Sequence, residues 1–512
     1  MRGAILAILI AGVMAVAIRW NSWVAGGSDS YCYIHQAERW AAALQLALTG
    51  QRPVLQVPES LAFDAPWPDA SRSFAPAGHL PSETVAGAIV PVCPAGLSIV
   101  MAPVVAIGGP RAAFIVLPVF GAVLILATYR VGSRFADHVG LASALVMASS
   151  PVFLYQLVQP MSDVPAAALW MLAVAAATGT GRSQAIVAGI TTSLAIVMRP
   201  NLLPLGVVIG VFLLLRPERP WSHRLRSAAI YAACCAPGCV IVALVQKAFY
   251  GSPLSSGYGS LTALFAFEHV GPNGRRYLQW LWQTQTPAIA LAVLAPWLLP
   301  GALVALLVAL FAVNLLLYVP YVVFDDWSFV RFLLPTLPLL VILVVAAVDA
   351  LLARFRVPLR RVALMTGALV LVFLCVQQAE ARSTFRLQRL ESRFARAGAY
   401  VERRLPPTAI VITSWESGSV RFYGHRKTLV WDQLPVDWLD RSIDYVRSQG
   451  YEPFLLFERW EEPLFRERFA GSDTAALDWP PMAEIGSQVR IYRPDDRKRY
   501  FEGHAAPTEY VP

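Results

Sequence analysis

Two aspartates of this sequence lie where apolar segments begin. Asp29 follows the pair Gly26-Gly27 a few residues after the first apolar segment, and Asp163 follows residues 160–162 between two later ones. Each carboxylate could simply cap the helix that follows it, and a capping carboxylate is a weak base. An ionisable residue at a membrane boundary is also a functional candidate. Two such carboxylates suit a glycosyl transfer, in which one takes a proton from an acceptor and the other orients that acceptor or a metal ion.

Three basic residues near similar boundaries could hold a phosphate group. Arg199 precedes Pro200-Asn201, Arg331 lies in an aromatic and leucine-rich segment, and Lys247 lies near the end of its apolar segment. Arginine presents a planar fork that suits phosphate oxygens. Lys247 could instead extend its ammonium to lipid head groups, which is the interpretation we favour for it. We therefore predict phosphate binding by Arg199 and Arg331, with Lys247 as a third candidate, and substrate binding by Tyr31.

The rest of the chain is apolar enough to place these residues at a membrane. Of its 512 residues, 56% are hydrophobic and 15% are charged, and the mean hydropathy is +0.53. This composition is typical of polytopic membrane proteins. The net charge of +9 does not indicate nucleic-acid binding, because the arginines collect in short blocks between apolar segments, where membrane orientation explains them. The scarcity of lysine beside abundant arginine suggests a bacterium with a GC-rich genome.

About eleven apolar segments are expected to span the membrane. The first, about 4–18, ends like a signal peptide, but we interpret it as a retained span that sets the orientation. The stretch 84–109 is ambiguous, because its prolines and Gly108-Gly109 would free backbone groups that lipid cannot satisfy. The remaining segments lie at about 112–128, 140–158, 164–178, 184–198, 202–215, 228–249, 287–301, 302–323, 329–350 and 362–378.

The arginine-rich blocks favour one orientation. If the stretch 84–109 dips into the membrane and returns, the blocks at 129–134, 216–226 and 354–361 all lie in the cytoplasm, as positively charged loops should. Residues 20–110 then form a large first outer loop. Asp29 begins an amphipathic helix at the outer surface of this loop, since apolar residues recur there at helical spacing.

The chain changes character near residue 380. We divide it into a transmembrane module, 1–380, and an extracytoplasmic α/β domain, 381–512, in which charged helical segments alternate with apolar strand-like runs. Strands are expected at 409–413, 428–431, 453–457 and 489–492, and helices at 383–404, 437–447 and 461–469. A structural or acceptor-docking role is favoured for this domain, because it carries no phosphate loop or metal-ligand spacing.

The six cysteines do not form a disulfide framework or a zinc motif. Four of them lie in apolar segments and are interpreted as small hydrophobic residues. Cys32 and Cys93 fall outside the membrane, where a bridge between them could form, but simple packing is favoured for them as well.

In their order and placement, these features resemble bacterial members of the GT-C superfamily of membrane glycosyltransferases, in the branch with protein O-mannosyltransferases and the lipid A aminoarabinose transferase. The likeness covers roughly residues 1–380. Some branches of the superfamily have two adjacent acids in the first loop, where this chain has Asp29-Ser30. Other branches have a basic residue before the prolines of the segment 91–97, where this chain has Cys93. The matching residues are Asp29, Pro91-Val92-Cys93-Pro94-Ala95-Gly96-Leu97, Ser150-Pro151, Met161-Ser162-Asp163, Arg199-Pro200-Asn201 and Arg331-Phe332-Leu333-Leu334-Pro335.

The resemblance implies a GT-C fold and an inverting transfer at the anomeric carbon, with Asp29 as general base and Asp163 supporting the acceptor site. The donor would be a polyprenyl-phosphate sugar, the acceptor a glycan, lipid or protein of the cell envelope, and the location the outer face of the bacterial plasma membrane. No cofactor is indicated, and a divalent cation is neither required nor excluded. The alternatives are a lipid-linked sugar transporter or flippase, a ligase or polymerase using a diphosphate-linked donor, and a membrane-anchored binding protein.

Overall fold

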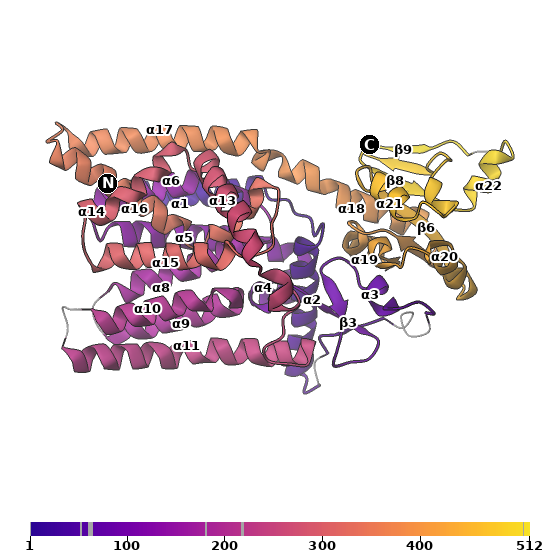
Figure 1. Cartoon of the computed structure of the whole chain (residues 1–512), viewed down its shortest axis with the longest axis horizontal. Coiled ribbons are helices and arrows are strands. Elements are labelled where there is room, and N and C mark those ends of the chain that lie inside the picture. The colour runs from indigo at the N-terminus through magenta and orange to yellow at the C-terminus, as the bar shows by residue number, and fades with distance from the viewer. Residues whose placement is uncertain (1, 52–53, 60–64, 180–181, 217–219, 505) are drawn as a thin grey trace.

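The computed structural model describes residues 2–512 except 52–53, 60–64, 180–181, 217–219 and 505. A bundle of apolar helices runs along the long axis of the molecule, and a smaller body of strands and helices lies at one end of it (Figure 1). Helix α2 (Asp29–Leu48) also lies at that end, which we call the α2 end. One continuous set of buried apolar side chains fills the bundle.

Each apolar segment predicted from the sequence carries helix. Some are broken by proline: α6 and α7 are bent by 60° at Ser150, where Pro151 begins α7 and cannot donate a backbone hydrogen bond to the preceding turn. The helices of the bundle are α1 (Arg2–Arg19), α5 (Val116–Gly132), α6 (Asp137–Ser149), α7 (Pro151–Leu157), α8 (Asp163–Ala177), α9 (Arg182–Met198), α10 (Leu203–Leu215), α11 (Trp221–Tyr250), α14 (Ala295–Leu298), α15 (Ala302–Tyr318), α16 (Leu337–Arg354) and α17 (Arg360–Ala381).

The helices differ in whether their length and composition suffice to cross a bilayer. Among the described residues, four helical stretches meet that requirement: 110–132, α11, α16 and α17. The bent pair of α6 and α7 would make a fifth, and seven further apolar helices are 10–17 residues long. The count of about eleven spans therefore stays a prediction.

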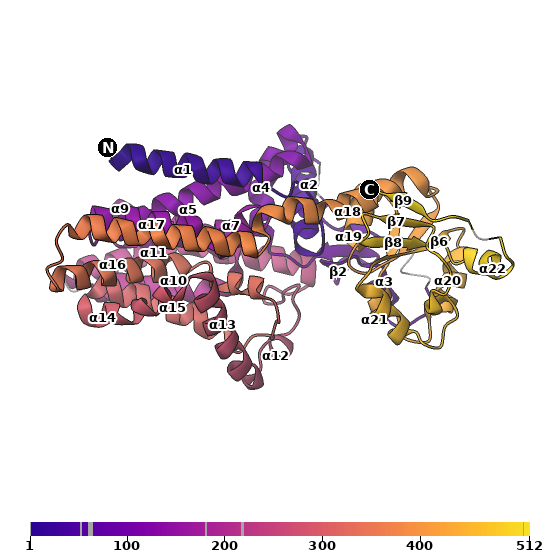
Figure 2. The ribbon, with the colours of Figure 1, turned by 90° about the horizontal axis from the view of Figure 1, so that it is seen from above.

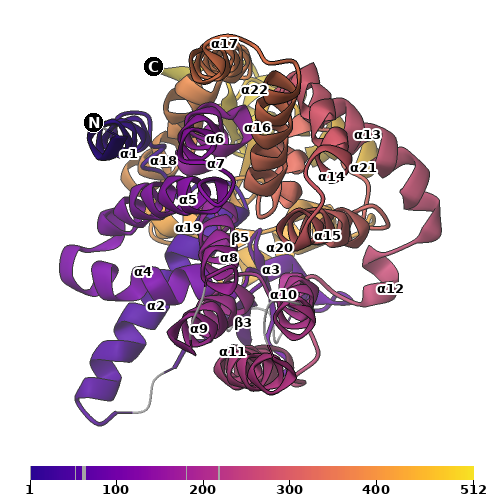
Figure 3. The ribbon, with the colours of Figure 1, turned by 90° about the vertical axis from the view of Figure 1, so that its left-hand side faces the viewer.

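The stretch 84–109 is not one continuous helix. It holds strand β3 (Ala88–Pro91) and helix α4 (Ala95–Gly108), and β3 pairs with both β1 (Val57–Pro58) and β2 (His79–Pro81). Figure 3 looks along the bundle, and α2 and α4 lie across the view while helices such as α9 and α11 are seen end-on. Both helices thus lie transverse to the bundle, as an interfacial segment should.

The structure corrects the interpretation of two cysteines. Cys32 and Cys93 form a disulfide that joins α2 to the turn before α4, whereas simple packing was favoured from the sequence. Sequence could not decide this, because the two residues are 61 positions apart and only the fold brings their Cα atoms to 6.2 Å.

The segment between the apolar runs 228–249 and 287–301 contains helices. It contains α12 (Leu261–Leu264) and the amphipathic helix α13 (Val270–Thr284), which protrude from the side of the bundle in Figure 2. The apolar run that follows is mainly the 3-10 helix η5 (Pro287–Leu294), ending in the short α14.

A six-stranded mixed sheet forms the centre of the second body, in the order β5-β4-β6-β8-β7-β9. All four strands expected from the sequence are present, and the short β7 and β9 are additional. Helices on both sides cover the sheet. The elements are α18 (Leu387–Arg404), β4 (Ala409–Ile412), α19 (Ser417–Gly424), β5 (Lys427–Leu429), α20 (Leu439–Ser448), β6 (Glu452–Glu458), α21 (Glu461–Arg468), β7 (Ala483–Ile485), β8 (Val489–Tyr492), α22 (Asp496–Phe501) and β9 (Glu509–Val511).

The first loop contributes to this second body. Helix α3 (Ala70–Phe74) brings Phe74 into the apolar core beneath β4 and β6, together with Trp67. The backbone N–H of Val430 donates to the carbonyl of Ser73 at 2.7 Å. Residues far apart in sequence therefore share one core at the α2 end.

Candidate active site at the α2 end

Asp29 is the first residue of α2 and pairs with an arginine. Its carboxylate makes no capping hydrogen bond, and the N-cap position belongs to Ser28. Instead, Oδ2 accepts a hydrogen bond from Nη2 of Arg331 at 3.0 Å. Arg331 lies in the 3-10 helix η6 (Trp327–Leu333), just before α16. The capping interpretation of Asp29 is therefore wrong, and the residue belongs to a charged contact between distant segments.

Asp163 makes the second pair. It begins α8, again without a capping bond, and its Oδ1 accepts from Nη1 of Arg199 at 2.7 Å. Arg199 lies between α9 and the 3-10 helix η3 (Pro200–Leu202), with extended backbone torsions. The proline that ends α9 thus turns the chain so that the guanidinium meets α8.

The two pairs belong to one cluster. The charge of Arg331 interacts with the carboxylates of both Asp29 and Asp163, and with Arg199. The Phe332 ring lies beneath both guanidinium groups, with centroid distances of 5.6 Å to Arg199 and 5.5 Å to Arg331. The structure therefore brings together the four predicted residues that come from α2, α8, the α9–η3 junction and η6.

Tyrosines that the sequence analysis missed surround this cluster. The hydroxyl of Tyr33 donates to Ser162 at 2.8 Å, which ties α2 to the start of α8. Tyr258 interacts electrostatically with Tyr33 and Asp29. Burial raises the pKa of Tyr33, so its hydroxyl stays protonated and can donate a hydrogen bond but cannot act as a base at neutral pH. Tyr33 could have been found, because it lies four residues after Asp29 and thus on the same helix face.

The two aspartates differ in access to solvent. The side chain of Asp29 is 43% exposed, whereas that of Asp163 is 1% exposed. A reacting molecule can therefore reach the carboxylate of Asp29. Asp163 is positioned to hold Arg199 and to balance its charge, because an arginine buried among aromatic rings needs such a partner.

Lys247 and Tyr31 lie apart from this cluster. Lys247 is exposed in the last turn of α11, and no hydrogen bond or ion pair joins it to another described residue. Tyr31 is buried, stacks on His35 with a centroid distance of 5.2 Å, and contacts Phe422 of α19. Tyr31 thus contacts its own helix, β2 of the first loop and α19 of the second body, and its predicted contact with substrate stays a prediction.

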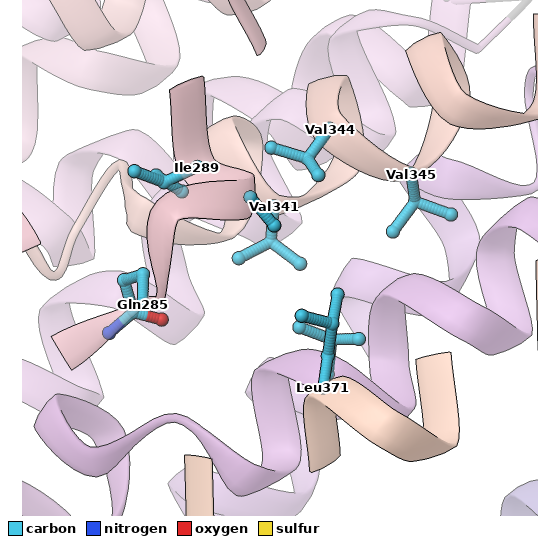
Figure 4. Close-up of a pocket in the computed structure, with 8 residues that line it drawn as sticks. Gln285, Ile289, Val341, Val344, Val345 and Leu371 are labelled. Carbon is cyan, nitrogen blue, oxygen red and sulfur yellow. The ribbon is translucent and has the colours of Figure 1, made fainter. Parts of the chain in front are cut away.

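The described residues show no group of three or more His, Cys, Asp or Glu side chains that could hold a metal ion. A crevice lies deeper in the bundle, between η5, α16 and α17 (Figure 4). Its cavity volume is about 10 Å³, and Gln285 is the only polar side chain among residues such as Ile289 and Leu371 that line it. A larger cavity of about 470 Å³, lined in part by Glu59 and Trp67, lies in the first loop. Neither cavity includes the four clustered residues.

This architecture defines a multi-pass helical membrane protein with a cluster of paired arginines and aspartates at one end of its bundle. No protein-family model matches the chain, and no curated protein matches it. Several solved structures match the chain.

The chain is similar to two structures of ArnT from Cupriavidus metallidurans. One is bound to undecaprenyl phosphate and is 11% identical, with a TM-score of 0.54 and coverage of 98% of this chain and 99% of that chain. The other, in the apo state, has 11% identity, a TM-score of 0.56 and coverage of 98% of both chains. The chain is also similar to the oligosaccharyltransferase of Archaeoglobus fulgidus tethered with an acceptor peptide, with 11% identity, a TM-score of 0.54 and coverage of 94% and 72%. The GT-C fold implied by the resemblance in sequence is thereby confirmed.

Proposed function

We propose that this protein is an inverting glycosyltransferase that moves a sugar from a polyprenyl-phosphate carrier to a cell-envelope acceptor. The observation that carries the proposal is the convergence of two arginine–aspartate pairs at one end of a membrane bundle. Arginines can hold a lipid phosphate, and an accessible carboxylate can take a proton. We further propose that this end faces the outside of a bacterial plasma membrane.

The roles follow from exposure and pairing. Asp29 is the general base, because its carboxylate is the accessible one. Arg331 and Arg199 bind the phosphate of the donor and stabilise the charge that develops on it as it leaves. Asp163 is a positioning residue that acts through Arg199.

The proposed step is a single in-line displacement. The acceptor oxygen or nitrogen attacks the anomeric carbon and forms the new glycosidic bond, while the bond between that carbon and the phosphate oxygen breaks. The polyprenyl phosphate leaves with the electron pair, and the proton of the acceptor passes to Asp29. Attack from the side opposite the phosphate inverts the configuration at the anomeric carbon.

The ion pair between Asp29 and Arg331 would couple donor binding to the basicity of Asp29. Nη2 of Arg331 donates to the carboxylate of Asp29 at 3.0 Å. A phosphate that binds Arg331 competes for the same guanidinium, and the released carboxylate becomes free to accept a proton. Binding of the donor would thus activate the base only when the substrate is present.

The similar structures support a lipid-linked donor. ArnT was solved with undecaprenyl phosphate, and the oligosaccharyltransferase AglB of Archaeoglobus fulgidus was solved with an inhibitory peptide and a dolichol-phosphate. Both structures thus hold a lipid phosphate on a protein with the same fold.

The test compares wild type with Asp29→Asn in purified protein, using radiolabelled polyprenyl-phosphate sugars and bacterial envelope fractions as acceptors. We expect transfer to fall by about 10²–10⁴-fold, because the amide cannot take the proton. The matched control is Asp325→Asn, which removes an exposed carboxylate paired with Arg276 just before η6 and should leave transfer unchanged.

Two results would contradict the proposal. Full transfer by Asp29→Asn with intact donor binding would exclude Asp29 as the base. Movement of the lipid-linked sugar across proteoliposomes, without formation of a new glycosidic bond, would instead indicate a transporter.

A further inference from the structure

Two exposed tryptophans lie at one edge of the sheet in the second body. Trp415 follows β4 and Trp460 follows β6, and these two strands are parallel neighbours. The Trp415 and Trp460 rings are 39% and 53% exposed and contact each other edge to face, with centroids 6.1 Å apart. Two exposed indole rings do not contribute the hydrophobic free energy that their burial would add to folding. A pair of such rings held in contact at the surface therefore indicates a binding surface.

The position of the pair in the sheet supports the same conclusion. Strand β4 lies between β5 and β6 in the sheet. The chain passes from β4 to β5 on one side and then crosses to β6 on the other side, so the strand order reverses at β4. The carboxyl ends of parallel strands at such a reversal form the usual ligand-binding crevice of α/β sheets. Trp415 and Trp460 both lie at that edge.

Buried carboxylates hold the ring of Trp460 and the backbone of Trp415. The indole N–H of Trp460 donates to Oε2 of Glu458 at 2.8 Å, and the backbone N–H of Trp415 donates to Oε1 of Glu461 at 3.1 Å. Glu416 is fully buried in the same group, and its Oε1 has no hydrogen-bond partner among the described residues. Arg393 donates to Glu458 at 2.8 Å and offsets part of this charge. The buried oxygen of Glu416 without a partner is still costly, which argues that this edge is maintained for a function beyond folding.

This edge faces the candidate active site. A Cβ atom built on Gly27 would lie 3.6 Å from the Trp415 ring. Asp29 follows Gly27 by two residues, a chain length of at most about 7 Å. A molecule bound on the two rings would therefore lie close to the proposed base.

We infer that Trp415 and Trp460 form a platform that binds a sugar ring of the acceptor, an inference that rests on the proposed function. Indole faces can stack on the apolar C–H face of a pyranose, and the platform would present the hydroxyl of that sugar to Asp29. A membrane anchor fits less well. Interfacial tryptophans direct their N–H groups to lipid head groups, whereas the N–H of Trp460 is used by Glu458.

The test measures acceptor binding directly, with the full chain in nanodiscs on an array of bacterial envelope oligosaccharides. We expect wild type to bind a defined subset of them, and Trp415→Ala and Trp460→Ala to bind that subset about tenfold more weakly or worse, a loss of about 1.4 kcal/mol. The matched control is Tyr510→Ala, which removes another exposed aromatic ring from β9, at the far edge of the same sheet. It should bind like wild type.

The outcomes separate this inference from the proposed function. If wild type binds no saccharide, or if both tryptophan variants bind as wild type does, the platform is excluded even when transfer depends on Asp29. If the variants lose affinity for protein-free anionic lipid vesicles instead of saccharides, the pair is a membrane anchor and the inference is overturned. Because both rings are partly exposed, retention of the wild-type thermal unfolding midpoint checks that each variant is folded.

Discussion

Burial raises the pKa of two glutamates at the edge of the sheet in the second body. Burial raises the pKa of Glu461 to about 7, although the backbone N–H groups of Glu458 and Trp415 both donate to it and lower it. Burial raises the pKa of Glu416 well above its ordinary value in the same part of the sheet. These glutamates therefore hold protons in the folded protein under conditions in which an unfolded chain would release them.

This raised pKa predicts a loss of stability with increasing pH. A carboxyl that binds its proton more tightly in the folded state stabilises the fold fully below its unfolded pKa of 4.5, and this contribution is lost as the pH rises through about 7. We expect the apparent Tm of the full chain to fall between pH 5 and pH 8, with Glu461 contributing at most about 3 kcal/mol. In Glu461→Gln the decline should be shallower, as measured by scanning fluorimetry in detergent.

The exposed Glu467 of the same helix provides the control, since Glu467→Gln should keep the full wild-type decline. An unchanged decline in Glu461→Gln would show that its carboxyl does not bind a proton more tightly in the folded state.

At the residue scale, the sequence identified the cluster but not its internal order. Asp29, Asp163, Arg199 and Arg331 could be selected because ionisable residues at the ends of apolar segments are costly and rare. Their pairing could not be predicted, since it depends on contacts across as many as 302 positions. Tyr31 was predicted to bind substrate, yet Tyr33 is the tyrosine of α2 whose hydroxyl reaches Ser162 beside the cluster.

Helix packing at the element scale depends on one glycine beside the cluster. A Cβ on Gly96, in the first turn of α4, would clash with the carbonyl oxygen of Val197 and would lie 2.5 Å from Cα of Met198, at the end of α9. Arg199 is the next residue. The close approach of α4 to α9 therefore helps to set where the Arg199 guanidinium lies.

We expect Gly96→Ala to displace the end of α9 and to weaken donor binding by about tenfold, because Arg199 would lose its alignment. Binding of a fluorescent polyprenyl phosphate to protein in nanodiscs measures this effect. Gly367→Ala in α17 is the matched control, because no atom lies within 4 Å of its added Cβ. Wild-type affinity in Gly96→Ala would mean that the packing of α4 does not control Arg199.

Elements with strong periodicity were predictable, and short or irregular ones were not. Apolar runs predicted the bundle helices, and β4, β5, β6 and β8 of the tail followed from their β-branched and aromatic residues. Strands β7 and β9 are three residues each and carry no pattern that distinguishes them from loops. Helix α13 was missed because its polar face gives it low overall hydropathy.

At the scale of the whole molecule, the first loop and the tail act as one body. Arg421 of α19 donates to the buried Glu59 of the first loop at 2.8 Å, and Trp67 and Phe74 pack into the core under the sheet. We therefore expect the tail and the loop that carries Asp29 to lie on the same side of the membrane.

Labelling with a membrane-impermeant maleimide tests this topology, in a variant whose four free cysteines are alanine. We expect Asp444→Cys, exposed in α20, to react in intact spheroplasts. Phe355→Cys, exposed at the opposite end of the bundle, should react only after permeabilisation, because arginine-rich loops remain in the cytoplasm. Labelling of both positions from the same side would contradict the arrangement.

The disulfide between Cys32 and Cys93 closes most of the first loop into a covalent ring of the chain. A single cut by a protease within that ring would leave both fragments attached, so the nicked protein would keep α2 fastened beside α4 until a reductant released it. Damage to the surface loop would thus be invisible on a non-reducing gel and evident on a reducing one.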